Sequence, residues 1–362
     1  MTPPEDRAPE PEPEPERTVS TFHEFATEWY AGQLAEGGWS GSTARDIREW
    51  RLARHILPIL AGYRLDEIGV EVIDNYRRAK VHEGLLSASS INKMLTTIAA
   101  ILEQAQEYGH IHANPAKGRR RRLKAGKPRR TYLDRAEQVS ALLDAAGELD
   151  RRGRVRPYRR ALLTTLVFSG LRIGEARDLE WRDVDIAKTR LKVRGTKTDA
   201  ADRTVRLLPA LRDELAALKA ARSPEPRDRV FGTSTGGALS ESNVRSRTLR
   251  PAVEAANAAL LAAEIVPIPD GLTPHSLRRT FASILVALKE DPASVMRQMG
   301  HTTAAFTLGV YAAAMETTDE ERNALRALVE GSYDAPPWGD LGKWAGQPAD
   351  RPSEPVEQPE AA

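Results

Sequence analysis

The chain has 362 residues and a net charge of +2, is 41% hydrophobic and 29% charged, and contains no cysteine. This composition is typical of a globular protein with more than one domain, and it excludes disulfides and thiolate metal sites. No apolar run is long enough to cross a bilayer and the acidic, proline-rich N-terminus is unlike a signal peptide, so we expect a cytoplasmic protein with no membrane partner.

The charge is distributed unevenly along the chain. Residues 1–17 and 334–362 each carry six acidic and two basic residues, a net charge of −4 apiece, so the total of +2 leaves +10 on residues 18–333. Both ends are rich in proline and acidic residues, and we expect 1–18 and 333–362 to be disordered tails. The basic body favours a polyanionic partner, most often nucleic acid, although a generally arginine-rich composition would also explain it.

Residues 19–115 have the periodicity of a small all-helical domain. The clearest stripe places apolar residues at i, i+3, i+4, i+7 and i+8 of one helix. A second helix is expected after Ser42 as its N-cap, a third near 70–81, and a fourth near 89–108 that ends before Asn114-Pro115. The residues of the first stripe are Phe22, Phe25, Ala26, Trp29 and Tyr30.

A strongly basic segment, PAKGRRRRLKAGKPRR, follows at residues 115–130. Its nine basic side chains repel one another unless counterions or phosphates lie nearby, so the run is not expected to pack. We expect 116–131 to be an interdomain linker, either simply solvated or acting as a strap along a DNA backbone. The candidate DNA-binding residues are Arg119, Arg120, Arg121, Arg122, Lys124, Lys127, Arg129 and Arg130.

Residues 132–332 have the pattern of a second domain. An apolar helix over 156–168 stops at Gly170, and alternating apolar residues on both sides of the polar turn TKTDAAD predict a β-hairpin over 185–208, with a third short strand as an option. The fold class predicted is therefore mainly α with a small β-hairpin or sheet, in two domains. Further helices are expected over 209–221, about 241–262, 274–288, 292–299 and 317–330.

Five polar features of the second domain need a common explanation, although each alone has an ordinary structural one. In chain order they are SGLRIGEARDL, the hairpin turn RGTKT, HSLRR, QMGHTT and TLGVYAA. In HSLRR the histidine and the first arginine are three residues apart and share a helix face. The candidate residues within these features are Arg172, Glu175, Lys197, His275, Arg278, His301 and Tyr311.

Together these side chains are the parts of a site that cuts a phosphodiester by covalent catalysis, without a metal or another cofactor. Arginine forks bind non-bridging phosphate oxygens and offset the charge of the transition state. A tyrosine can be the nucleophile, an imidazole the general base, and a lysine the general acid. A shared phosphate would also explain why the imidazole of His275 lies beside guanidiniums that penalise its protonation.

In these motifs, and in the tyrosine that comes ten residues after His301, the chain resembles the tyrosine recombinases of the phage-integrase class. The resemblance covers about residues 19–330. It implies a core-binding, DNA-binding domain over 19–115 and a catalytic domain over 132–332. It also implies a site-specific recombinase that acts in bacteria, at the nucleoid, in the integration of a mobile element.

The resemblance further implies a role for each matching residue. Tyr311 would attack the scissile phosphate and form a 3′-phosphotyrosyl link. Arg172 and Arg278 would clamp the non-bridging oxygens, and His275 would take or return the tyrosine proton. Lys197 would protonate the leaving 5′-oxygen.

The remaining implied roles concern support and assembly. His301 would hydrogen-bond the phosphate, and Glu175 would support the site from behind. Lys192 lies on the same hairpin as Lys197 and is the alternative general acid. Strand exchange through a four-way junction would need a homotetramer on double-stranded DNA and no ATP, with a directionality factor as an optional partner. The helix at 317–330 would pack either in its own chain or on a neighbouring protomer.

Two other functions remain open on the sequence. A type IB topoisomerase uses similar chemistry but reseals the same strand, and the recognisable core-binding domain argues against it. A non-catalytic DNA-binding protein is disfavoured by the complete set of catalytic motifs. The target site depends on which side chains reach the groove edges, and the helical stripes do not show this.

Overall fold

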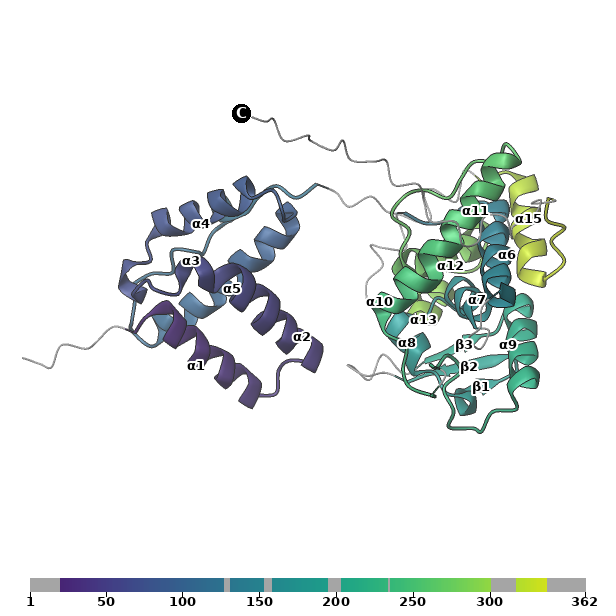
Figure 1. Ribbon diagram of the computed structural model, residues 1–362, viewed down its shortest axis with the longest axis horizontal. Helices are drawn as coiled ribbons and strands as arrows, with labels where there is room; N and C mark the ends of the chain where they lie inside the picture. Colours follow the sequence, from purple (N-terminus) through teal and green to yellow (C-terminus); the bar gives the residue numbers. More distant parts are fainter. Residues whose placement is uncertain are drawn as a thin grey trace, which may run out of the picture. The chain divides into compact units, whose positions relative to one another are not determined.

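The computed structural model describes residues 20–126, 131–152, 158–194, 203–233, 235–300 and 317–336. The chain divides into two compact units, Met1–Pro128 and Arg129–Ala362, and each has a hydrophobic core of its own. Most of the described residues are helical, and one small sheet lies in the second unit (Figure 1). This confirms the predicted fold class. No helix in these ranges is both long and apolar enough to span a bilayer.

The first unit is built from helices. The predicted stripe is buried, since Phe22, Phe25 and Trp29 all lie in the core. One prediction is wrong: Ser40 caps the second helix by accepting a hydrogen bond from the Thr43 N–H, and Ser42 lies inside that helix. The elements are α1 (Phe22–Ala35), α2 (Gly41–Arg45), a π-helical stretch (Asp46–Ile56), α3 (Leu57–Leu60), a 3₁₀ turn (Leu65–Glu67), α4 (Val70–His82) and α5 (Ala88–Glu107).

The first half of the basic segment packs against this unit, contrary to the expectation that the run cannot pack. Asn92 of α5 donates to the Leu123 carbonyl at 2.9 Å and accepts from the Leu123 N–H at 2.8 Å. Arg122 Nη1 donates to the Asn92 carbonyl at 2.6 Å, and Lys117 forms an ion pair of 2.6 Å with Glu103. The helix therefore satisfies the backbone groups of Leu123, hydrogen-bonds Arg122 and compensates the charge of Lys117, which weakens the repulsion that the sequence predicts.

The second unit contains a three-stranded antiparallel sheet in the order β1-β2-β3. The third strand allowed by the sequence is present as β1. The β2–β3 register pairs Val193 with Arg203 and Lys192 with Thr204. The elements are α6 (Ala136–Arg152), α7 (Arg159–Ser169), α8 (Ile173–Asp178), β1 (Val184–Asp185), β2 (Arg190–Val193), β3 (Arg203–Arg206), α9 (Pro209–Arg222), α10 (Glu241–Val244), a π-helical stretch (Arg245–Leu249), α11 (Arg250–Ala262), α12 (Pro274–Ala287), α13 (Pro292–Met299) and α15 (Asp319–Glu330).

Helix α12 is the central element of the second unit and packs against α7, α13 and α15 (Figure 1). Leu277 and Phe281 are fully buried on it. Helix α15 also contacts α6 and α9 of the same chain, and its apolar stripe is buried there. Of the two options for the helix predicted at 317–330, the described structure thus shows packing within its own chain.

Gly170 controls how closely α7 approaches α12. It ends α7, as predicted, with a positive φ of 62°. A Cβ atom added at this position would lie 2.4 Å from Cδ1 of Phe281. The missing side chain lets the end of α7 close onto α12, and so brings the loop before Arg172 next to the helix that carries His275 and Arg278.

Candidate active site

Arg172 immediately precedes α8 and is anchored by Glu175, one turn into that helix. The Arg172 N–H donates to Glu175 Oε2 at 2.7 Å, and its Nη1 donates to Oε1 at 2.8 Å. Its Nη2 also donates to the Gly300 carbonyl at 3.4 Å. The side chain nevertheless stays 48% exposed. Arg172 is therefore held in place while much of its guanidinium remains accessible to an anion.

Arg203, at the start of β3, holds the other side of Glu175. Its Nη1 and Nη2 donate to the two carboxylate oxygens at 3.0 and 2.8 Å, and both side chains are nearly buried. Burial alone would raise the pKa of Glu175, but hydrogen bonds from Arg203 and from the Arg172 backbone, with the charge of Arg203, lower that pKa to about 2. The carboxylate is thus ionised at neutral pH.

The sequence motifs did not point to Arg203. A signal was present, because Arg203 lies two residues before the buried Val205 and so shares the inward face of the strand. An arginine at an inward position of a strand needs a buried partner. The alternation was used to predict the hairpin but not to place its charged residues.

Arg278 lies on α12 in the buried part of the site and is 1% exposed. Its Nη1 donates to the Gly170 carbonyl and its Nη2 to the Met299 carbonyl. Its Nε is buried and has no hydrogen-bond partner among the described residues. Burial, followed by the charge of Arg172, lowers the pKa of Arg278 to about 9. A buried guanidinium close to a second cation is stabilised most by an anion placed beside it.

His275 is in the first turn of α12 and has a solvent-exposed side. Partial desolvation by the surrounding protein, followed by the charges of Arg279, Arg278 and Arg172, lowers the pKa of His275 below its ordinary value of 6.5. At neutral pH the imidazole is therefore uncharged and can accept a proton.

The structure brings together four of the residues predicted from the motifs, Arg172, Glu175, His275 and Arg278. With Arg203 added, three guanidiniums and one carboxylate give the cluster a formal charge of +2. The cluster is thus built to receive an anion that is not part of the described chain. Lys197, His301 and Tyr311 lie outside the described residues.

Comparison with known proteins gives the same family as the sequence motifs. Residues 134–317 match the model of the phage integrase family. The chain belongs to this family of tyrosine recombinases. It is an enzyme, a site-specific DNA recombinase, as the sequence motifs predict.

Relatives and solved structures agree with this family. The recombinase is 29% identical to the tyrosine recombinase XerC of Alcanivorax borkumensis over 231 residues, covering 63% of this chain and 70% of the relative. It is 31% identical to XerC of Pseudomonas aeruginosa over 242 residues, with the same two coverages. A lambda integrase dimer bound to a COC′ core site superposes with a TM-score of 0.64 at 19% identity, covering 83% of this chain and 98% of that chain.

A further structural neighbour is the Tn1549 transposon integrase in complex with transposon right-end DNA. Its TM-score is 0.63 at 18% identity, and the match covers 83% of this chain and 97% of that one. At this level of identity the likeness shows the fold of the recombinase alone.

The position of Lys192, the alternative general acid, bears on the assignment of that role. Lys192 of β2 pairs with Thr204 and is exposed. Val193 and Arg203, the neighbouring pair, lie on the opposite, inward face that contacts Glu175. Lys192 of the recombinase therefore points away from the cluster.

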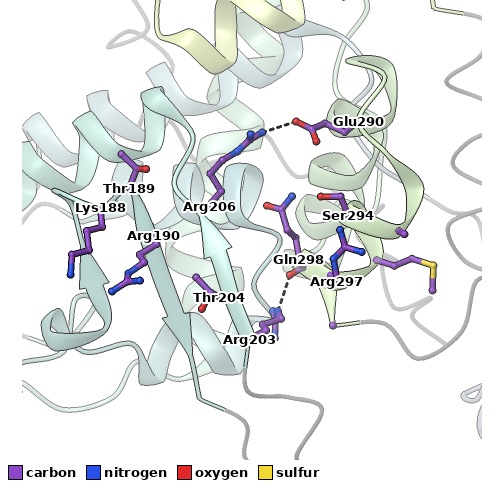
Figure 2. Close-up of a pocket in the computed structure, with 13 residues that line it drawn as sticks. Lys188, Thr189, Arg190, Arg203, Thr204, Arg206, Glu290, Ser294, Arg297 and Gln298 are labelled. Carbon is purple, nitrogen blue, oxygen red and sulfur yellow. Dashed lines mark hydrogen bonds and ion pairs between the residues drawn. The ribbon is translucent and has the colours of Figure 1, made fainter.

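An open cavity of about 960 Å³ lies beside the site, between the sheet and α13. Figure 2 shows Arg203 at its lower edge, bonded to Gln298, and Arg206 at its upper edge, paired with Glu290. These two contacts, at 2.8 and 2.6 Å, connect β3 to α13 and to the segment that precedes it.

Part of the basic segment of the recombinase is described. Arg122 lies against α5, whereas Arg120 and Lys124 are exposed and Arg121 is partly buried. The Arg119 side chain and residues Lys127, Arg129 and Arg130 lie outside the described residues.

Proposed function

We propose that this recombinase cuts and rejoins DNA through a 3′-phosphotyrosyl intermediate and a four-way junction, without metal or ATP. The observation that carries the proposal is the +2 cluster around the buried Arg278, whose Nε faces no acceptor among the described residues. A DNA phosphate is an anion of the right charge and geometry for such a guanidinium fork.

The described side chains support the binding of the phosphate. A guanidinium has five N–H groups, and the contacts of Arg278 to Gly170 and Met299 use two of them. The others, with the exposed part of Arg172, would donate to the non-bridging oxygens. These donors are held in position before the reaction begins, and such preorganisation makes electrostatic stabilisation of a transition state effective.

The bond changes that we propose conserve the number of bonds to phosphorus. The Tyr311 oxygen attacks phosphorus and gives up its proton to the neutral imidazole of His275. The bond from phosphorus to the 5′-oxygen breaks, and Lys197 protonates that oxygen. His301 hydrogen-bonds the phosphate. The outward direction of Lys192 supports Lys197 as the acid.

The second half of the reaction reverses these steps on another strand. The 5′-hydroxyl of a partner strand attacks the phosphotyrosine and releases the tyrosine, so the number of phosphodiester bonds is conserved. Two such exchanges need four protomers. A lambda integrase tetramer bound to a Holliday junction, with a TM-score of 0.62 to this chain at 20% identity, supports that assembly.

We assign the parts of the chain accordingly. Residues 19–115 would be the core-binding domain, 116–131 the linker and 132–332 the catalytic domain, flanked by acidic tails at 1–18 and 333–362. The linker would follow the DNA backbone through its exposed basic side chains, such as those of Arg120 and Lys124. The enzyme would act on nucleoid DNA in the bacterial cytoplasm, with a directionality factor as an optional partner.

The decisive experiment traps the intermediate on a library of genomic duplexes that carry random nicks. A nick next to the scissile phosphate lets the short 5′-hydroxyl strand diffuse away, so the protein stays linked to DNA. We expect a protein–DNA adduct whose linked peptide contains Tyr311 with a 3′-phosphate, and no adduct with Tyr311→Phe. Failure of the full chain to form any adduct, or linkage through another residue, would overturn the proposal.

Strand transfer separates the proposed function from its main alternative. Sequencing of the trapped adducts identifies the target site, and two intact duplexes that carry this site are then incubated together with the protein. A recombinase exchanges strands between the two duplexes and gives recombinant products, whereas a type IB topoisomerase reseals each cut strand to its own 5′-hydroxyl and gives none.

The pKa of His275 predicts how cleavage depends on pH. A general base must be neutral, and the pKa of this imidazole lies below 6.5 in the protein without DNA. At DNA concentrations below saturation the rate reports the protein without DNA. We therefore expect cleavage to fall as the pH is lowered, with the midpoint of the fall below 6.5. An acid limb with its midpoint above 6.5, or one unchanged in His275→Asn, would contradict this role.

A further inference from the structure

Arg203 of β3 contacts two other parts of the described site. Its two Nη atoms bind the Glu175 carboxylate, and its Nε donates to the Gln298 carbonyl at 2.8 Å. Its side chain also lies against Gly300, where an added Cβ would sit 3.2 Å from Arg203 Cδ. With 6% of its surface exposed, Arg203 is a buried connection between β3, the start of α8 and the end of α13.

The contact with Glu175 has an electrostatic consequence for Arg172. Both arginines bind the same carboxylate, but Arg203 does so through two parallel bonds, and Arg172 uses a single guanidinium N–H. The two-bond geometry is the stronger one. Without Arg203, the charge of Glu175 would be available to Arg172 alone, and the cluster would have a formal charge of +1 instead of +2. Glu175 would then compete with a phosphate for Arg172.

The contact with the end of α13 has a geometric consequence. Gly300 has a positive φ of 59° and its carbonyl accepts from Arg172. Gln298 and Gly300 flank Met299, whose carbonyl accepts from Arg278. Arg203 therefore fixes the same short stretch that both arginines of the proposed clamp, Arg172 and Arg278, use as an anchor.

We propose that Arg203 is a positioning residue of the phosphate clamp, which offsets the charge of Glu175 and fixes the Gln298–Gly300 stretch so that Arg172 and Arg278 are directed at the anion. The inference rests on the proposed function, since the clamp has a catalytic meaning only if a DNA phosphate is the anion.

The test compares Arg203→Gln with a matched control on the same strand. Arg206 is three residues further on and pairs with Glu290 at 2.6 Å, but its side chain is 55% exposed. We expect Arg203→Gln to slow adduct formation on the nicked duplex roughly 10- to 100-fold, the range expected when a supporting partner of a functional group is lost. Arg206→Gln should stay within about twofold, since exposed ion pairs contribute little.

A double-mutant cycle with Glu175→Gln separates positioning from a general loss of structure. If Arg203 acts through Glu175, Arg203→Gln should have much less effect in the Glu175→Gln background than in the natural chain. Effects that simply multiply would overturn the inference, as would an Arg203→Gln variant that cleaves at the rate of the natural chain. Arg203→Lys, which keeps the charge but loses the fork, should fall in between, and it replaces Arg203→Gln if that variant does not fold.

Orthovanadate, a tetrahedral anion, gives a readout that does not require DNA cleavage. We expect it to raise the melting temperature of the full chain and of Arg206→Gln, and to do so less for Arg203→Gln. If the natural chain binds vanadate in this way but forms no DNA adduct, the proposed function fails and the inference on the clamp stands. If vanadate stabilises Arg203→Gln as much as the natural chain, the inference fails.

Discussion

Arg278→Lys is expected to reduce adduct formation on a nicked duplex by about 10²- to 10³-fold, the loss typical for removing one preorganised donor to a transition state. The guanidinium reaches two carbonyls at once, Gly170 on one side and Met299 on the other. A lysine ammonium is a single point charge and cannot replace this planar fork. The variant therefore keeps the charge of the site but loses its geometry.

DNA binding should change much less than cleavage in this variant. Most of the affinity for DNA comes from many phosphate contacts over the whole protein, and Arg278 is 1% exposed. The measurements are the single-turnover rate of adduct formation, DNA affinity at a fixed salt concentration, and the melting temperature. Arg212→Lys, on the exposed side of α9, is the control. A cleavage rate within a factor of about ten of the natural chain would rule out the clamp role of Arg278.

Gly170→Ala is expected to destabilise the second unit by about 2–5 kcal/mol. A left-handed conformation costs an L-residue about 1–2 kcal/mol, and overpacking a core typically costs a further 1–3 kcal/mol. Both apply here, because φ is 62° and the new Cβ would lie 2.4 Å from the ring of Phe281. Relief of the clash requires α7 and α12 to separate, so the Gly170 carbonyl should also move away from Arg278 and cleavage should fall.

Gly331→Ala is the matched control for this steric effect. Gly331 has a φ of 78°, also left-handed, but a Cβ there would meet its nearest atom at 3.8 Å, an ordinary contact. Only the backbone cost of about 1–2 kcal/mol should remain. Calorimetric unfolding of the two variants measures the difference. Equal destabilisation by both would show that the approach of Phe281 to Gly170 is not a tight constraint.

Local patterns predicted most of the described elements, since the physics that forms them is local. The apolar stripe of α1 and the termination of α7 at Gly170 both follow from side chains within a few residues of one another. The exception is the cap of α2. Ser40 and Ser42 carry the same hydroxyl two residues apart, and the choice between them depends on the path of the preceding chain.

Long-range contacts explain what the sequence left open. The basic run appeared too repulsive to pack, but Asn92, which is 31 residues from Leu123, supplies the backbone partners that hold its first half against α5. The motif HSLRR predicts that Arg278 shares a helix face with His275, yet Arg278 is buried because the ends of two other helices bring carbonyls to it.

By itself, the sequence determined the family, the helical content and the kinds of side chain in the site, since these depend on residue identity and on spacing along single elements. Only the tertiary structure decided that Arg203 holds Glu175, that Lys192 faces away, and that Arg278 lies beneath the surface. The contacts of Arg203 and Arg278 join residues that are from about 20 to more than 100 positions apart. Such contacts depend on how whole elements pack, and the register of one short strand or the closeness of one glycine to one phenylalanine is enough to set them.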